Sequence, residues 1–308
     1  MAGKKGQAMT YLMGATLVFL AGLLWSVQGL IIRLIEDAGP WTVLFWRSAG
    51  MVPVLLIWLG ISSRGRVLGE IRAAGLPGLI GGMGLVMAFS GAIYSFQTTS
   101  VANAVLLFTA SPFFAAVLGR LLLGEMVSAL TWAAIALAVL GVGVMVGGGM
   151  AGGNALGNAA ALLSALGFAA FTVTCRWGHL ENNLPAVLMG GLLSMVAGAA
   201  MTQIMDQPLL VAPNDMGLAA AMGAVTLAGG LILYTLGSRS VPAAQATLIS
   251  LVEVLLAPIW AWAVLGETVA QGTLIGGAVL MAAVVMNAWG GRQGAGDGAG
   301  EAISSKKS

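Results

Sequence analysis

The sequence predicts an all-α integral membrane protein with ten transmembrane helices, arranged as two inverted five-helix repeats around a central cavity. Composition is the first reason, because 59% of the 308 residues are hydrophobic and only 8% are charged. A soluble domain carries roughly 25% charged residues, so this chain has too little polar surface for a water-soluble protein. The other two reasons are the length of its apolar segments and a repeat within the sequence.

The repeat relates the two halves of the chain. Residues 106–146 are LLFTASPFFAAVLGRLLLGEMVSALTWAAIALAVLGVGVMV, and residues 248–287 are LISLVEVLLAPIWAWAVLGETVAQGTLIGGAVLMAAVVMN. Each stretch is an apolar helix with a proline inside, then LLGE or VLGE, then a second apolar helix rich in Gly and Ala. Membrane proteins built from two similar halves commonly hold a binding site between the halves.

The apolar segments define the predicted spans. The first run, residues 10–32, follows Lys4 and Lys5. It is longer than the apolar core of a signal peptide, about 7–15 residues, so we expect a retained spanning helix. A span needs about 20 mainly apolar residues, and turn residues and charges separate such segments. The predicted spans are 10–34, 41–61, 73–96, 101–123, 129–146, 156–177, 185–204, 216–236, 242–265 and 271–289.

The placement of Lys and Arg predicts the orientation, because cytoplasmic loops carry an excess of both. Ten spans put both termini on one side of the membrane. If that side is the cytoplasm, the outer loops hold Arg33, and Arg47 lies just inside the outer end of the second span. The inner loops and ends then hold Lys4, Lys5, Arg64, Arg66, Arg72, Arg120, Arg176, Arg239, Arg292, Lys306 and Lys307. We therefore predict a multi-pass protein of the bacterial inner (plasma) membrane with cytoplasmic termini.

Five spans in each half make the second half inverted relative to the first. Glu125 follows the fourth span on the inner side, whereas Glu267 follows the ninth span on the outer side. The boundary is the glycine-rich stretch 147–153, which divides the chain into repeats 1–149 and 150–292. The sequence from Gly290 onward is rich in Gly, Ser and Lys, and we expect residues 293–308 to form a disordered cytoplasmic tail.

Glu253 is the candidate that the sequence singles out most clearly, because it lies near the middle of the ninth span. A carboxylate at the bilayer centre costs several kcal/mol unless it is protonated, paired or hydrated. One interpretation is a group that exchanges a proton or binds a cationic substrate in a wet cavity. The other is a neutral glutamic acid that bonds to a neighbouring helix.

Arg47 allows two interpretations as well. Its planar guanidinium suits bidentate binding of a substrate carboxylate. Alternatively, the side chain extends to the outer headgroups from the first turns of the second span. The shallow position of Arg47 favours this second interpretation.

Polar and aromatic residues at mid-depth form a third group, which we expect to face protein or a cavity and not lipid. As a set they indicate a cavity with aromatic walls and a few hydrogen-bonding groups. For single members, Ser, Thr, Asn and Gln also serve to join helices. The predicted substrate-binding residues are Trp25, Gln28, Tyr94, Gln97, Asn103, Phe108, Thr109, Ser111, Phe168, Thr172, Tyr234, Gln245, Ser250 and Glu253.

Two prolines lie inside predicted spans, Pro112 in the fourth and Pro258 in the ninth. Proline removes a backbone donor and tends to kink a helix. We expect a kink at each position, which serves either as a hinge or as a permanent bend that opens the cavity.

The sequence lacks the patterns of an enzyme. His179 is the single histidine, so a site with several histidine ligands cannot form, and we expect no metal and no cofactor. Neither a Gly-x-Ser-x-Gly motif nor a phosphate-binding P-loop occurs. The chain cannot hydrolyse ATP by such a motif, and Cys175, the single cysteine, excludes an intrachain disulfide.

The order of these parts resembles the drug/metabolite transporter superfamily, specifically the EamA type with two five-helix repeats. The resemblance rests on GLLWSVQGLIIR (22–33), on Arg47 in FWRSAG, on residues 162–176, and on SVPAAQATLISLVEVLLAPIWAWAVLGE (240–267). Two features depart from the family pattern. Glu253 is followed by Val254 where the family often has proline, and the second half has no arginine that matches Arg47.

The resemblance implies export, because members of this family export amino acids, drugs and other small metabolites. We predict a secondary transporter that moves small metabolites outward by alternating access. Amino acids are the leading cargo, with aromatic ones suggested by Trp25, Tyr94, Phe108 and Phe168. The alternatives are a drug or organic-cation exporter and, in another class, a non-transporting receptor or scaffold.

The expected partners are the lipid bilayer and a small-molecule substrate, without nucleic acid. The sequence leaves open whether transport is coupled to protons, and whether the protein is a monomer or a weak homodimer.

Overall fold

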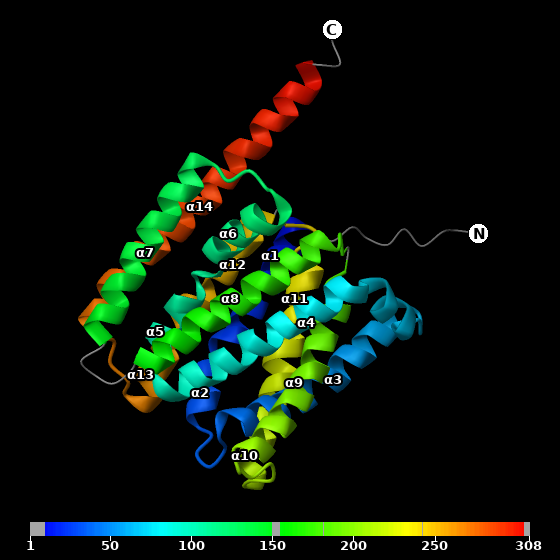
Figure 1. The fold of residues 1–308 in the computed structure, drawn as a ribbon, viewed down its shortest axis with the longest axis vertical. Helices are drawn as coiled ribbons and strands as arrows, with labels where there is room; N and C mark the ends of the chain where they lie inside the picture. Colours follow the sequence, from blue (N-terminus) through cyan, green and yellow to red (C-terminus); the bar gives the residue numbers. More distant parts are fainter. Residues whose placement is uncertain (1–9, 150–154, 181, 242, 305–308) are drawn as a thin grey trace.

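The computed structural model describes residues 10–149, 155–180, 182–241 and 243–304, and every regular element in these ranges is a helix. The helices form one bundle, in which α7 (Ala129–Gly149) and α14 (Gln271–Ser304) lie side by side at one edge (Figure 1). The predicted all-α membrane fold is confirmed. The remaining helices of the first half are α1 (Tyr11–Ser26), α2 (Gln28–Arg33), α3 (Pro40–Ser62), α4 (Val67–Thr98), α5 (Val101–Phe108) and α6 (Ser111–Leu123).

The second half also consists of helices. A π-helix, η2 (Met222–Gly229), lies between two α-helices of one span. The α-helices are α8 (Ala155–Trp177), α9 (Leu184–Ile204), α10 (Pro213–Ala221), α11 (Gly230–Gly237), α12 (Ala243–Ser250) and α13 (Val252–Leu265).

The predicted spans correspond to helical segments of the structure. Within the described residues, 8 segments are long and apolar enough to cross a membrane. They are Tyr11–Arg33, Pro40–Ser62, Val67–Thr98, Val101–Leu123, Ala129–Gly147, Ala155–Trp177, Leu184–Ile204 and Pro213–Gly237. Two shorter apolar helices, Val252–Leu265 and Gln271–Asn287, stand where the ninth and tenth spans were predicted. The protein is a multi-pass membrane protein.

Breaks in the spans lie near mid-depth. In the fourth span the break lies between Phe108 and Ser111. Pro112, in the first turn of α6, explains it, because its ring excludes a regular helix through the preceding turn. Unpaired backbone groups at membrane depth need a protein or water partner, and the Thr109 hydroxyl donates to the Leu106 carbonyl oxygen at 2.6 Å.

The ninth span breaks at Leu251, between α12 and α13. Pro258, where we expected the kink, lies inside α13 and is not the cause of this break. In the repeat, Leu251 is equivalent to Thr109 when Glu125 is aligned with Glu267. The two halves are therefore broken at equivalent positions. Discontinuous helices of this kind surround the binding sites of many secondary transporters.

Glycines bring helices into backbone contact. A Cβ atom added to Gly84 of α4 would lie 2.8 Å from the carbonyl oxygen of Gly167 in α8. A Cβ atom on Gly141 of α7 would lie 2.7 Å from the carbonyl oxygen of Gly276 in α14. Since real side chains do not approach a backbone oxygen so closely, glycine is required at both contacts.

We expect Gly141→Leu to destabilise the protein, because the new side chain would push α7 away from α14. Overpacking of this kind costs about 1–3 kcal/mol. Gly143→Leu is the matched control on the same helix, since nothing lies within 4 Å of a Cβ there. Thermal unfolding in detergent should show a lower melting temperature for Gly141→Leu alone. Equal melting temperatures for the two variants would contradict the packing described for α7 and α14.

The last helix, α14, continues to Ser304. The disordered cytoplasmic tail expected over residues 293–308 stays a prediction. Residues 305–308, the last part of the predicted tail, lie outside the described residues.

Candidate functional site

A cavity of about 1810 Å³ lies in the middle of the bundle, between the two halves. The first half contributes Trp25, Gln28, Phe108, Thr109 and Ser111 to its wall. The second half contributes Phe168, Thr172, Tyr234, Ser250 and Glu253. The structure therefore brings most of the predicted site residues to one cavity.

Several wall positions are equivalent in the repeat. Aligning Glu125 with Glu267 pairs Ser111 with Glu253 and Phe108 with Ser250. Aligning Arg33 with Arg176, at the ends of the first and sixth spans, likewise pairs Trp25 with Phe168. Both members of each pair line the cavity. Equivalent positions from the two halves thus face the same space.

Aromatic rings form part of the wall. The rings of Trp25 and Tyr234 are 5.6 Å apart between centroids, and those of Phe168 and Phe171 are 5.8 Å apart. Phe96 meets Phe108 edge-to-face at 5.3 Å. All six side chains line the cavity. Such walls suit an amphipathic molecule with an apolar or aromatic portion.

Four predicted residues lie outside the wall of this cavity: Tyr94, Gln97, Asn103 and Gln245. On α4 the inner wall includes Leu85, Ala88, Phe89, Ala92 and Phe96, and Tyr94 points from another face of the helix. Asn103 is buried and bonds to Asn158, while Thr273 donates to its side-chain oxygen at 3.3 Å. Asn103 therefore joins helices, which was the alternative interpretation for such residues.

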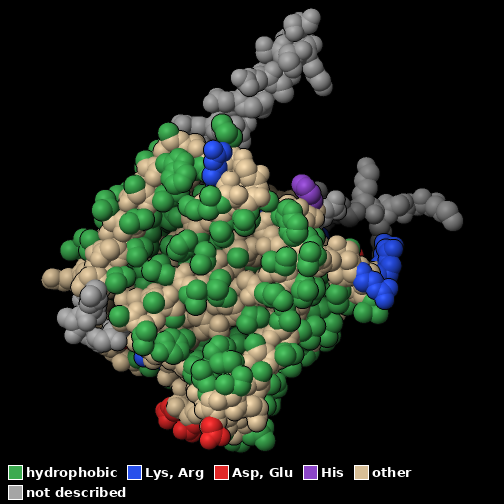
Figure 2. Space-filling model, in the orientation of Figure 1, with side chains coloured by type: hydrophobic (Ala, Val, Ile, Leu, Met, Phe, Trp, Pro, Cys, Tyr) green, Lys and Arg blue, Asp and Glu red, His purple; other side chains and the backbone are tan. Residues whose placement is uncertain are grey.

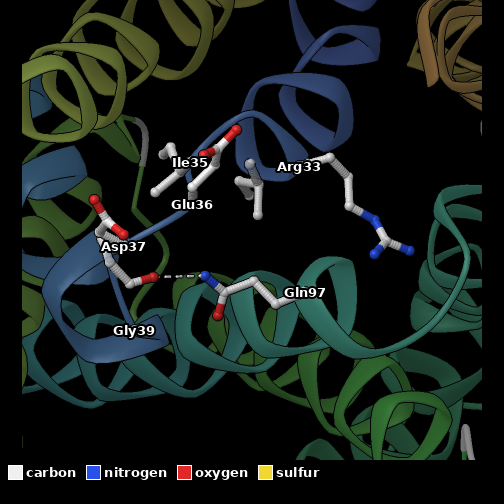
Figure 3. Close-up of a pocket in the computed structure, with 8 residues that line it drawn as sticks. Arg33, Ile35, Glu36, Asp37, Gly39 and Gln97 are labelled. Carbon is white, nitrogen blue, oxygen red and sulfur yellow. Dashed lines mark hydrogen bonds between the residues drawn. The ribbon is translucent and has the colours of Figure 1, made fainter.

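Gln97 belongs to a smaller pocket of about 350 Å³ at the opposite end of α4 from Val67 (Figure 3). Its side-chain amide donates to the carbonyl oxygen of Ala38 at 3.0 Å. Arg33, in the same pocket, points away from the carboxylates of Glu36 and Asp37 (Figure 3). This pocket belongs to the loop between α2 and α3 and is separate from the central cavity.

Glu253 stands in the first turn of α13, directly after the break in the ninth span. Free backbone N–H groups at a helix start favour a negative charge there. The carboxyl group lines the cavity and makes no hydrogen bond or ion pair with any described residue. It is therefore available to a proton or a cationic group in the cavity.

Arg47 also lines the cavity, and the interpretation that it extends to the headgroups is wrong. The side chain is only 3% exposed, and its guanidinium carbon lies 4.6 Å from the centre of the Phe89 ring. Leu44, Met51 and Leu55 are buried at helical spacing from Arg47, so position 47 lies on the face of α3 that packs against the protein. The sequence does not mark this face, because the span is apolar on its other faces as well.

The cavity opens at one end of the bundle, which we call the basic end. Its wall there includes Ser62, Glu125, Arg176, His179 and Arg239, all at or beyond helix ends. Most of the arginine side chains that Figure 2 shows lie at this end, whereas Asp and Glu side chains gather near α10 at the other end. We call the latter the acidic end.

At the acidic end an ion pair closes the bundle between the halves. Arg33 lies 3.6 Å from Glu267, measured between Nη2 and Oε2. The same Nη2 donates to the Thr99 carbonyl oxygen at 2.6 Å. The other carboxylate oxygen of Glu267 accepts from the Val101 backbone N–H at 2.6 Å. This cluster joins the ends of α2 and α13 to the start of α5.

The basic end holds the equivalent pair, Arg176 and Glu125, at 2.8 Å. Gly124 and Gly266, the glycines of LLGE and VLGE, both end a helix with positive φ, 69° and 67°. Glycine adopts this conformation without strain, and it turns the next residue, the glutamate, out of the helix. The repeated motif thus places one glutamate beside one arginine at each end.

A helical membrane protein with two similar halves and a large cavity between them is built as a transporter. The profile of the EamA-like transporter family matches residues 12–147 and again residues 155–289. The chain belongs to the EamA-like transporter family, within the drug/metabolite transporter superfamily, and it is not an enzyme.

Solved structures show the same fold. One of them, titled only "Crystal structure of protein", is 18% identical, with a TM-score of 0.60. The similarity covers 90% of this chain and 98% of that one. At this identity the likeness shows the fold alone. A comparison with curated proteins finds no match.

Proposed function

We propose that this protein is a secondary transporter of the bacterial inner membrane that exports small metabolites, foremost amino acids, by alternating access. The observation that carries the proposal is the cavity between the halves, which is lined from equivalent positions of both and reaches the helix ends at the basic end. Such a site can pass from one side to the other when the halves rock against each other.

The open end supports loading from the cytoplasm. Loops rich in Lys and Arg stay on the cytoplasmic side, and the cavity opens among Arg176, Arg239 and their neighbours. The cluster of Arg33, Glu267, Thr99 and Val101 closes the other end. An exporter needs such a state to take up its cargo.

The wall supports an amphipathic cargo with a cationic group. Phe108, Phe168 and Trp25 offer apolar and aromatic surface, and Glu253 offers a negative or protonatable group among them. An amino acid has a side chain that can contact the apolar and aromatic surface and an ammonium group that can pair with Glu253. Proton exchange at Glu253 would couple transport to the proton gradient.

The second candidate is export of drugs or organic cations. Glu253 with the paired rings of Trp25 and Tyr234 favours it, since aromatic faces and a carboxylate together attract cations. A non-transporting receptor or scaffold has no need for two similar halves around an open cavity.

Transport by the purified protein alone separates these functions. Vesicles with the reconstituted protein receive a panel of labelled amino acids and organic cations under an imposed proton gradient. We expect protein-dependent movement of amino acids, which protein-free vesicles do not show. Movement of cations alone would support the second candidate, and movement of neither would contradict transport of these cargoes.

We expect both termini in the cytoplasm, because the described arginines gather at the end where α1 begins. A reporter that is active only in the cytoplasm, fused after Arg292, should be active. The control is the same reporter inserted after Glu36, in a loop at the acidic end, where it should be silent. The reverse pattern would mean that the orientation is wrong.

A further inference from the structure

Arg47 is a buried cation that the proposed mechanism has not used. It lies about 10 Å along α3 from Pro40, within the apolar part of the membrane. Its Nε and Nη2 atoms are buried and have no hydrogen-bond partner among the described residues. The two ion pairs of those residues, Arg33 with Glu267 and Arg176 with Glu125, do not include it. A buried charge without a partner is costly and calls for an explanation.

The surroundings hold Arg47 in the cavity wall. The backbone of α3 touches η2 at this point, so that a Cβ atom on Gly223 would collide with the Arg47 carbonyl oxygen. The Phe89 ring covers one face of the guanidinium. The neighbouring wall residues Leu85, Ala88 and Leu227 are apolar. The guanidinium is therefore positioned in advance, in surroundings that strengthen its attraction for an anion.

A second unpartnered donor lies in the same wall. The indole nitrogen of Trp25 is buried and has no hydrogen-bond partner among the described residues. The cavity wall thus holds two kinds of buried donor without a partner among the described residues, the Arg47 guanidinium and the Trp25 indole N–H, which packs against Gly230, and one unpaired carboxyl group, Glu253. A ligand that satisfies the donors must bring acceptor oxygens and a negative charge.

We infer that Arg47 binds the carboxylate of the transported molecule and so sets the specificity of the cavity for carboxylate-bearing cargo. This inference rests on the proposed function, since it concerns the cargo of the same cavity. The forked guanidinium can donate two parallel hydrogen bonds to the two carboxylate oxygens. Glu253 then attracts the ammonium group of a zwitterionic cargo, whereas amines and amides leave Arg47 unpaired.

Four indole compounds test the inference: tryptophan, tryptophan amide, tryptamine and indole-3-propionate. Two of them carry a carboxylate and two do not. Ligands that bind the folded state raise the melting temperature of a protein, so binding can be measured on purified protein in detergent without a label. The wild-type protein should respond to both carboxylates at concentrations at least about tenfold lower than to the amide or the amine, the ratio that one good charged contact supports.

The variant Arg47→Gln should lose this preference, with at least about tenfold weaker binding of the carboxylates and unchanged binding of the amide and the amine. Arg47→Lys keeps the positive charge but lacks the two parallel donors of the guanidinium. This variant should therefore bind the carboxylates with intermediate strength. Arg72→Gln, an exposed arginine of α4 outside the cavity wall, is the matched control and should behave as the wild type.

The inference would be overturned if Arg47→Gln weakened the binding of all four compounds equally, or if it weakened the binding of none. If Arg47→Gln does not fold, the inference is tested by binding of the four compounds to the wild-type protein. Equal binding of tryptophan amide and tryptophan by the wild type would then overturn the inference. A wild type that binds neither carboxylate overturns it too. The proposed function fails separately, when vesicles transport no amino acid, and carboxylate binding at Arg47 can still be measured in that case.

Discussion

Glu253→Gln should abolish transport driven by a pH gradient, so that accumulation falls to the level of protein-free vesicles. Glutamine keeps the shape of the side chain and most of its hydrogen bonds, but it cannot exchange a proton. The residue lines the cavity without a partner among the described residues, so a proton bound there can be exchanged with the cavity water. When no gradient is applied, the variant should still exchange cargo, but more weakly, because the charged contact with the ammonium group of the cargo is lost.

The measurement is the initial rate in vesicles across about pH 5.5–8.5, a range that covers proton exchange by carboxyl groups removed from water. The wild-type rate should change across this range and the variant rate should be flat. Glu36→Gln, an exposed carboxyl in a loop at the acidic end, controls for the loss of one acid. A variant with the wild-type profile would remove Glu253 from the mechanism, and melting temperatures establish whether the variant is folded.

Glu267→Gln should open the acidic end. The substitution removes the ion pair with Arg33 and weakens the bond from the Val101 N–H. Hydrogen bonds to charged groups contribute about 1.5–3 kcal/mol each, so we expect outward-open molecules to increase by roughly 10–100-fold. The excess of one state should slow the complete transport cycle.

A thiol in the cavity reports this change. Ser111→Cys, made with Cys175→Ser to remove the single native cysteine, places the thiol in the wall. A membrane-impermeant maleimide should label it slowly from the acidic side, and much faster once Glu267→Gln is added. Glu36→Gln in the same background should leave labelling unchanged. Equal labelling with and without Glu267→Gln would show that the cluster does not close this end.

The sequence predicts the spans well because the bilayer itself imposes them. Only long apolar helices can satisfy their backbone in lipid, so hydropathy alone places elements such as α3 and α9 within a few residues. The break near Pro112 follows from local chemistry as well. The break at Leu251 does not, since no proline or glycine stands there, and only the repeat relates it to Thr109.

The cavity was harder to predict, because depth along a helix does not say which face a residue occupies. Trp25 and Phe168 line the cavity, as expected of polar and aromatic residues that avoid lipid at mid-depth, and their role in binding stays a prediction. Tyr94 and Asn103 stand at suitable depths but lie outside the cavity wall, and Asn103 bonds to residues of other helices. Depth alone is misleading for Arg47, because the burial of Leu44, Met51 and Leu55 on its face of α3 is visible only in the structure.

The most direct test of the account is counterflow in vesicles that contain the purified protein and no ion gradient. Vesicles are loaded with an unlabelled amino acid and diluted into a trace of the labelled one. If the cavity opens alternately to the two sides, label accumulates transiently inside, because unlabelled cargo leaving the vesicle brings labelled cargo back. Glu36→Gln, an exposed residue outside the cavity wall, should retain this exchange, and protein-free vesicles should show none. If the wild type transports amino acids down a gradient but never accumulates label in this exchange, alternating access at the central cavity is contradicted.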